Sequence, residues 1–505
     1  MTNKGAHSRG AHVRKEQSSS AYRGNRGIAV VFIAIALVLM LIPSVGMIWF
    51  PTGSTSGIDE PAAAPSFVTE DGSPNVAVLS DAGAYFEDHF AFRNEMITAY
   101  ANMLAPLRES VTDQVVVGTD GWLYYGLTLP DYLGQSALSD RALHNIAHNL
   151  ALMQGYADAQ GADFVFAIAP NKNSLYPENM PSRYIRSEAP GNWERLKPVL
   201  DERGVQYVDL FETLADSDET LYMKTDSHWN NRGALIAANA LLDAFGRPAL
   251  EYGDDDWVTR DDFQGDIAKM LYPADPGTEE QQYVRRVNGT GGFSGPDWDY
   301  VQGETVEDDL IETQPSGKAD GADGRLLMYR DSFGNALIPY LSTAYGDSLF
   351  TKLVPYDAGQ IADFDADNVV VERAERHLYY LAEHAPIMPA PLVSLSFKVP
   401  AEDSGDMGET TLDQSENGPY AVLSGVLDAS IEGDDVGIFI EVTGTDGKKS
   451  VYEASLVTVP EDGETGAAAS DYGYEIYLPR EVVPANATLR VIATDDGELL
   501  GVKAF

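Results

Sequence analysis

Between residues 80 and 388, short apolar runs alternate with segments in which apolar residues recur at helical spacing. Such runs are typical of buried strands, and apolar positions three and four apart are typical of helices with one buried side. The expected strands are 115–117, 122–125, 164–169, 205–210, 326–329 and 369–372, and the expected helices are 82–107, 139–159, 193–203, 233–245 and 335–345. Strands alternating with helices predict an α/β domain with a mostly parallel sheet.

The pattern changes near Pro391, where strand-like runs alternate with Gly/Asp turns. The runs are 420–426, 436–442, 474–478 and 488–493. They predict a small β-sandwich over 391–505, for which glycan binding is one role. Within the α/β region, residues 273–323 are rich in Gly, Asp and Glu, and we interpret them as an insertion or a long loop.

The N-terminal region predicts a membrane anchor. Residues 28–50 carry no charge and are long enough to cross a bilayer as a helix, which needs roughly 20 apolar residues. Basic residues dominate the tail 1–27 and acidic ones follow the helix, so we expect a single-pass protein with a cytoplasmic N-terminus and an extracytoplasmic main domain. A cleaved signal peptide is the alternative, although its apolar core is shorter, roughly 7–15 residues. Residues 51–79, rich in Gly, Ser, Pro and Ala, are typical of a linker.

Composition limits the chemistry. A formal net charge of -44 argues against nucleic acid as a partner. The absence of cysteine excludes thiol nucleophiles, thiolate metal sites and disulfides. With 505 residues, the chain is long enough for two or three folded units.

Two polar segments could carry chemistry together. Asp226 and His228 are two positions apart before the helix 233–245, so in an extended loop their side chains point the same way. A carboxylate there can fix the tautomer of the imidazole. Ser332 follows a strand and precedes a helix, at the sheet edge where α/β folds place their sites, and its backbone N–H could stabilise an oxyanion. The three residues supply a nucleophile, a base and an orienting acid.

Simpler interpretations exist for each segment alone. Asp331 or Ser332 could cap the following helix, and Asp226 could make an ordinary loop hydrogen bond to His228. Either simpler interpretation is favoured when its segment is considered by itself. The combination of the two segments is what favours serine catalysis.

Metal sites are less well supported. His144 and His148 are four residues apart but lack the glutamate of zinc proteases, so we expect a solvated or half-buried helix face there. The acids at 254–256 and 261–262 lack EF-hand spacing and are interpreted as solvated, and His377 is interpreted as structural. We expect neither a metal ion nor a cofactor.

Six sequence blocks resemble, in order, the SGNH-hydrolase-like family that includes the alginate O-acetyltransferases and the related bacterial DHHW proteins. They span about residues 80–385, and their order and spacing carry the resemblance. The blocks are Phe86-Glu87-Asp88-His89-Phe90-Ala91-Phe92-Arg93, Gly118-Thr119-Asp120-Gly121-Trp122-Leu123-Tyr124, Ala169-Pro170-Asn171-Lys172 with Tyr176-Pro177-Glu178, Asp226-Ser227-His228-Trp229 with Gly233, Arg330-Asp331-Ser332-Phe333, and Glu372-Arg373-Ala374-Glu375-Arg376.

The resemblance implies a flavodoxin-like three-layer α/β/α sandwich, with Ser332 as nucleophile, His228 as general base and Asp226 as its partner. Arg330 stands where many SGNH enzymes have a glycine whose N–H is an oxyanion donor. Arg330 is therefore a candidate oxyanion or substrate-binding residue through its charge, and the alternative is that it only packs. Asn171 and Lys172 are expected to shape the pocket.

The resemblance also implies a membrane-anchored O-acetyltransferase that acts on a cell-surface or secreted polysaccharide, supplied by a multi-pass membrane acyltransferase. Two alternatives stay open. The same three residues could hydrolyse acetyl esters, or the chain could be a catalytically silent protein that binds or assembles cell-wall glycan.

Overall fold

The chain was described from a computed structural model, which covers residues 18–47, 49, 62–69, 72–284, 299–302, 310–314, 322–431, 433, 435–460, 469–484 and 486–505. It separates into two compact units. The first comprises residues 1–107 and 269–276, and the second comprises residues 108–268 and 277–505. The predicted tail up to residue 17, and residues 51–61 and 70–71 of the predicted linker, lie outside the described residues.

The first unit is helical where it is described. Its main helices are α1 (Ser18–Gly46), α2 (Val78–His89) and α3 (Arg93–Leu104). Within α1, Gly27–Gly46 is long and apolar enough to cross a membrane by length and composition, and it ends before the predicted residue 50. The single helix predicted over 82–107 is wrong, because the backbone at Phe92 turns into the left-handed region with φ 64° and separates α2 from α3.

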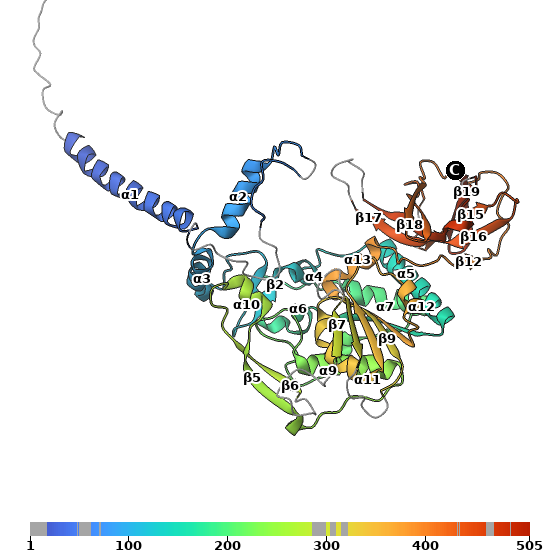
Figure 1. Cartoon of the computed structure of the whole chain (residues 1–505), viewed down its shortest axis with the longest axis horizontal. Helices are drawn as coiled ribbons and strands as arrows, with labels where there is room; N and C mark the ends of the chain where they lie inside the picture. Colours follow the sequence, from blue (N-terminus) through green and yellow to red (C-terminus); the bar gives the residue numbers. More distant parts are fainter. Residues whose placement is uncertain are drawn as a thin grey trace, which may run out of the picture. The chain divides into compact units, whose positions relative to one another are not determined.

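The second unit is built around a mixed sheet (Figure 1). Within the described residues it has seven strands in the order β4-β3-β11-β9-β10-β8-β7. The first five are parallel, and β8 and β7 extend the sheet antiparallel. These strands are β3 (Asp163–Ala169), β4 (Tyr207–Val208), β7 (Asp299–Gln302), β8 (Leu310–Gln314), β9 (Arg325–Tyr329), β10 (Asp347–Thr351) and β11 (Asn368–Ala374).

Strand alternation divides the core into two hydrophobic clusters. Phe164, Phe166 and Ile168 of β3 join one cluster, whereas Val165 and Ala167 join the other. The first cluster includes residues of α5 (Asp140–Gln160), α7 (Asn192–Arg203), α12 (Gly359–Asp363) and α13 (Leu378–Glu383). The second includes residues of α8 (Leu210–Ala215), α9 (Asn231–Ala244) and α11 (Ile338–Ala344).

Shorter elements surround the sheet. The hairpin predicted near residue 120 is present as β1 and β2, joined by a turn with Gly121 at φ 83°. The remaining elements of this part are β1 (Val115–Val117), β2 (Leu123–Tyr125), α4 (Leu129–Tyr132), α6 (Lys172–Leu175), β5 (Trp257–Phe263), α10 (Asp266–Leu271) and β6 (Glu279–Val284).

The C-terminal region is rich in β-strands. The described residues form two antiparallel sheets, ordered β12-β16-β15-β19-β20 and β13-β14-β18-β17, which share one hydrophobic cluster. The strands are β12 (Leu392–Val393), β13 (Asp413–Asn417), β14 (Tyr420–Val426), β15 (Val436–Thr443), β16 (Lys449–Glu453), β17 (Ser455–Val459), β18 (Ser470–Pro479), β19 (Thr488–Asp495) and β20 (Glu498–Ala504).

Some predicted elements differ from the structure in extent or in type. The strand expected over 205–210 shrinks to Tyr207–Val208, because the Asp209 carboxylate caps α8 by accepting from the N–H groups of Phe211 and Glu212. The helix expected from 335 begins at Ile338, after a 3-10 turn. The stretch 273–323 contributes β6, β7 and β8 where it is described, so it is not only a loop.

Candidate active site

The loop between Tyr222 and Trp229 carries the predicted acid and base. Tyr222 and Trp229, at the two ends of the loop, form an antiparallel bridge that closes it. Inside it, the Asp226 carboxylate accepts from the His228 backbone N–H at 3.0 Å and from His228 Nδ1 at 2.7 Å. Because Nδ1 donates to the carboxylate, Nε2 carries the lone pair of the neutral ring.

Ser332 lies three residues beyond β9, which ends at Tyr329. Its Oγ is 2.8 Å from His228 Nε2, so the hydroxyl donates to the imidazole lone pair. Its φ of -68° and ψ of -23° are unstrained, and only the 3-10 turn Phe333–Ala336 follows. The expected helix N-terminus is therefore absent directly after Ser332. Asp331 makes the capping bond instead, accepting from the Phe333 N–H at 2.9 Å.

The surroundings of His228 shift the pKa of its imidazole. Burial favours the neutral ring, but the hydrogen bond to Asp226 and the charges of Asp226 and Asp266 outweigh it and raise the pKa of His228. Burial tends to raise the pKa of Asp226, but the hydrogen bond and charge of His228 lower it overall. Ser332 and His228 are both partly exposed, so a substrate can reach them.

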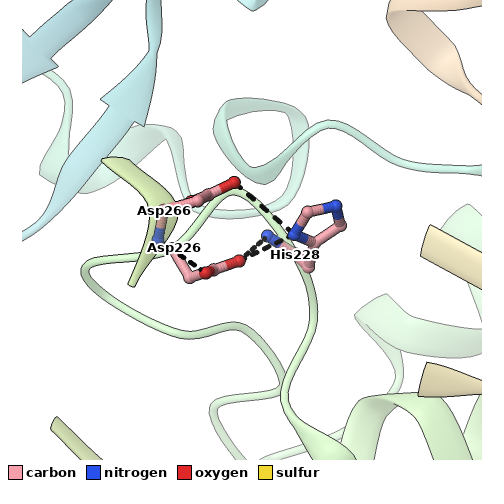
Figure 2. A group of neighbouring side chains, drawn as sticks. All are labelled: Asp226, His228 and Asp266. Carbon is pink, nitrogen blue, oxygen red and sulfur yellow. Dashed lines mark hydrogen bonds and ion pairs between the residues drawn. The ribbon is translucent and has the colours of Figure 1, made fainter. Parts of the chain in front are cut away.

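Asp266 is a second carboxylate on the same imidazole, which the sequence analysis missed. Its Oδ2 lies 3.6 Å from His228 Nδ1, and Figure 2 shows both carboxylates turned toward this side of the ring. Its backbone N–H donates to Asp226 Oδ2 at 2.8 Å, while its own carboxylate accepts from Ser227 N and Ser227 Oγ. A Cβ on the preceding Gly265 would meet the Thr225 carbonyl oxygen at 2.1 Å, a close approach that the sequence alone does not reveal. A glycine at such a close approach marks two backbones in contact.

Lys172 holds the loop from inside. Its buried Nζ donates to three backbone carbonyls, of Met223 at 3.0 Å, Lys224 at 3.0 Å and Asp226 at 2.5 Å. Burial lowers the pKa of Lys172 to about 8, against the opposing charges of Asp226 and other acids. From the other side, the Glu279 carboxylate accepts from the Lys224 N–H at 2.7 Å. Lys172 therefore positions the acid and base and does not line a pocket as a free cation.

Arg330 and Asn171 are likewise committed to internal bonds. The Arg330 side chain is fully buried, and its Nη1 donates to Asn335 Oδ1 at 2.5 Å. The backbone N–H of Asn171 donates to Glu375 Oε2 at 2.9 Å, and its amide Nδ2 donates to Asp131 Oδ2 at 3.0 Å. Both residues support the sheet edge that carries Ser332.

The histidine pair of α5 has a structural environment. His144 is half-buried, as expected, but the solvated or half-buried face was the wrong prediction for His148, which is buried. His148 Nε2 lies 2.9 Å from the Ala454 carbonyl oxygen, and Arg203 Nη1 lies 3.4 Å from Nδ1. The ring is thus packed between α5 and the C-terminal strands and has no lone pair left for a metal.

One cluster has the composition of a metal site. Ligand atoms of Asp226, His228 and Asp266 lie within 4.8 Å of one another. However, each of these atoms already takes part in the hydrogen bonds described above, and the imidazole nitrogen between the carboxylates is a donor. This arrangement fits a proton-transfer site better than a metal site.

Comparison with known proteins agrees with the predicted resemblance. Residues 115–290 match the family model described as the SGNH hydrolase-like domain of the acetyltransferase AlgX, a range that contains Asp226 and His228 but ends before Ser332. The probable alginate O-acetylase AlgJ of Pseudomonas syringae pv. tomato is 28% identical over 262 residues, which are 50% of this chain and 62% of that relative. The chain thus matches less than two thirds of this relative's length.

Two solved structures are also similar. Bacillus cereus PatB1 shares 17% identity over 52% of this chain and 96% of its own, with a TM-score of 0.40. The O-acetyltransferase domain of Pseudomonas putida AlgJ shares 20% identity over 52% of this chain and 91% of its own, with a TM-score of 0.33.

Proposed function

We propose that this chain, whose residues 115–290 match the SGNH hydrolase-like domain of an acetyltransferase, transfers acetyl groups to hydroxyls of a cell-surface or secreted polysaccharide. The observation that carries the proposal is the continuous hydrogen-bonded series from Asp226 through His228 to Ser332, at 2.7 Å and 2.8 Å. The similarity to probable alginate O-acetylases supports the acetyl group and the polysaccharide acceptor.

In the first half-reaction, Ser332 acts as the nucleophile. His228 Nε2 takes the hydroxyl proton as Oγ bonds to the acetyl carbonyl carbon, and the carbonyl π electrons move onto its oxygen. Asp226 stabilises the imidazolium that forms. When the tetrahedral intermediate collapses, the donor oxygen leaves with the proton from His228, and the acetyl group stays on Ser332.

In the second half-reaction, a sugar hydroxyl replaces the donor. His228 takes the proton of that hydroxyl, its oxygen attacks the acetyl-serine, and the proton returns to Ser332 as the sugar ester leaves. Water in place of the sugar would give the alternative, a carbohydrate acetyl esterase. Nothing in the geometry of the three residues favours one acceptor over the other.

We further propose that α1 anchors the protein in the cell membrane, with the N-terminus in the cytoplasm. The apolar span Gly27–Gly46 and the basic residues before it support this orientation. A donor on the outer side then requires a multi-pass membrane acyltransferase as partner. For the domain around Ser332, the two hydrophobic clusters that share β3 support a flavodoxin-like three-layer sandwich.

Incubation of the full-length protein, in detergent, with 4-nitrophenyl acetate and an oligosaccharide tests the proposal. We expect acetylated sugar with the wild type, and a loss of at least about 1000-fold in rate with Ser332→Ala or His228→Ala, because a triad acts as a unit. Mass spectrometry should detect an acetyl group on Ser332. Free acetate without acetylated sugar would support the esterase, and equal rates in the wild type and Ser332→Ala would support a catalytically silent protein.

A further inference from the structure

Arg376 lies in a turn that is fixed on both sides. The turn Glu375–His377 follows directly after β11. On one flank, Glu375 Oε2 accepts from Ser174 Oγ at 2.6 Å as well as from Asn171, near the end of β3. On the other flank, His377 Nδ1 lies 3.0 Å from Asp331 Oδ2, next to Ser332. The backbone that presents Arg376 is therefore held against the edge of the sheet that carries Ser332.

The guanidinium group of Arg376 lies on aromatic rings of this site. Its Cζ is 5.3 Å from the ring centroid of Phe333 and 5.5 Å from that of Tyr125. Phe333 is the residue after Ser332, and its ring centroid is 4.8 Å from that of His228. The same phenyl ring thus supports both the base and the guanidinium.

In the described part of the chain, Arg376 makes no direct ion pair with a carboxylate, although its charge helps to lower the pKa of the neighbouring Asp331. Among the residues that the structure describes, it makes no ion pair or hydrogen bond, and its Nε is buried without an acceptor. By contrast, Arg330 Nη1 and Lys172 Nζ donate to internal acceptors. In a chain with 78 acidic residues, a partly buried arginine near Ser332 that makes no direct ion pair or hydrogen bond among the described residues can donate to another group.

We propose that Arg376 stabilises the negative charge that develops on the acyl oxygen when Ser332 attacks; this inference rests on the serine mechanism proposed above. As the bond from Oγ to the carbonyl carbon forms, the carbonyl electron pair moves onto the oxygen, and a guanidinium N–H donates to it. When the donor oxygen leaves with the proton from His228, the carbonyl re-forms and the charge disappears. Arg376 thereby takes the role for which Arg330 was a candidate by sequence.

The charge of Arg376 also acts on the base. Three ionised groups face His228: Asp226 and Asp266 from the loop side, and Arg376 from the turn after β11. The positive charge lowers the pKa of His228, whereas the two carboxylates raise it. Removing Arg376 should therefore raise that pKa and move the acid limb of the rate profile to higher pH.

The test measures acylation of the full-length protein by 4-nitrophenyl acetate, as the stopped-flow burst of 4-nitrophenolate. We expect Arg376→Gln to lower the acylation rate by about 100- to 1000-fold, as loss of one oxyanion donor does, with little change in KM. Arg376→Lys should keep part of the rate, and guanidinium chloride should partly rescue Arg376→Ala. Arg183→Gln is the matched control, since Arg183 also lies over a tyrosine, Tyr184, at 5.0 Å but outside the site.

Two results would overturn the assignment. Arg376→Gln could acylate within about threefold of the wild type, or it could change only the KM for the polysaccharide, which would make Arg376 an acceptor-binding residue. A Ser332→Ala variant that still acylates would instead overturn the serine mechanism, and the role of Arg376 with it. The two failures are therefore distinguishable in one series of variants.

Discussion

At the scale of single residues, the site combines one imidazole with two carboxylates. Asp226 bonds His228 directly, and Asp266 lies close enough to act on it through its charge. In the proposed mechanism His228 must be deprotonated to accept the Ser332 proton, so activity should fall as the pH drops through the raised pKa of His228. The position of that acid limb reports the charges around the ring.

Asp266→Asn should shift the acid limb of kcat/KM to lower pH. The substitution removes a negative charge that raises the pKa of His228, so the imidazole stays neutral in more acidic solution. The measurement is a pH profile of acylation for the variant and the wild type. The exposed Asp261→Asn serves as control and should leave the limb in place. If Asp266→Asn moved the acid limb to higher pH, the proposed electrostatics would be contradicted. For Arg376→Gln, by contrast, a shift to higher pH is the expected result.

The sequence nominated Asp226, His228 and Ser332 because their residue types and short-range order carry the information. The structure brings these three within hydrogen-bonding distance. Asp266 was missed because it follows Asp226 by 40 positions, and only the chain path of the fold brings it next to the loop. Arg376 lies in one of the six sequence blocks, but its proposed role depends on ring contacts that no spacing predicts.

At the scale of elements, α5 connects the α/β region with the C-terminal strands. One polar row of this helix bonds backbone groups of those strands: Arg141 to Val436, Asn145 to Asp471, His148 to Ala454 and Asn149 to Leu456. The periodicity of apolar residues predicted this helix and which of its sides is buried. It could not predict that the opposite polar side is also buried, because polar side chains with buried partners look the same in sequence as solvated ones.

His148 should make stability depend on pH. Burial, and then the charge of Arg203, lower its pKa from 6.5 to about 3 in the folded chain. Below pH 6.5 the unfolded chain takes up a proton that the folded chain refuses, so stability is present above pH 6.5 and is lost as the pH falls toward 3. When the pH falls from about 7 to about 5, protonation of His148 in the unfolded chain should lower the free energy of unfolding by about 2 kcal/mol.

Urea denaturation of the wild type and His148→Gln at several pH values measures this contribution. Glutamine can still donate to the Ala454 carbonyl but does not titrate, so the difference in unfolding free energy between the two proteins should shrink as the pH falls. The half-buried neighbour His144→Gln is the control. If the difference in unfolding free energy between the two proteins did not change with pH, His148 would have to bind its proton equally in the folded and the unfolded chain, which would contradict the prediction.

At the scale of the whole molecule, net charge sets how acceptors approach. The chain carries a formal charge of -44, so an anionic polysaccharide meets long-range repulsion that a neutral one does not. Salt screens this repulsion, with a Debye length of about 10 Å at 0.1 M.

The KM for a polyuronate acceptor should therefore fall as NaCl rises from about 20 mM to about 200 mM, whereas the KM for a neutral oligosaccharide should stay constant. Rates of acetyl transfer to both acceptors at each salt concentration provide the measurement. The burst of 4-nitrophenolate is the internal control, since that donor is uncharged. A KM for the polyuronate that rises with salt would indicate a cationic binding surface that overcomes the net charge.

The anchoring of the loop by Lys172 has a consequence for the energetics of turnover. One ammonium group ties three carbonyls of that loop to the segment after β3, while Ser332 is set by β9, and both strands flank β11 in the sheet. The proposed base and nucleophile thus stand on neighbouring strands of one sheet, hydrogen-bonded to each other before any donor arrives. In the proposed mechanism, binding of the acetyl donor therefore need not bring these two groups together, and little reorganisation energy is left for it to supply.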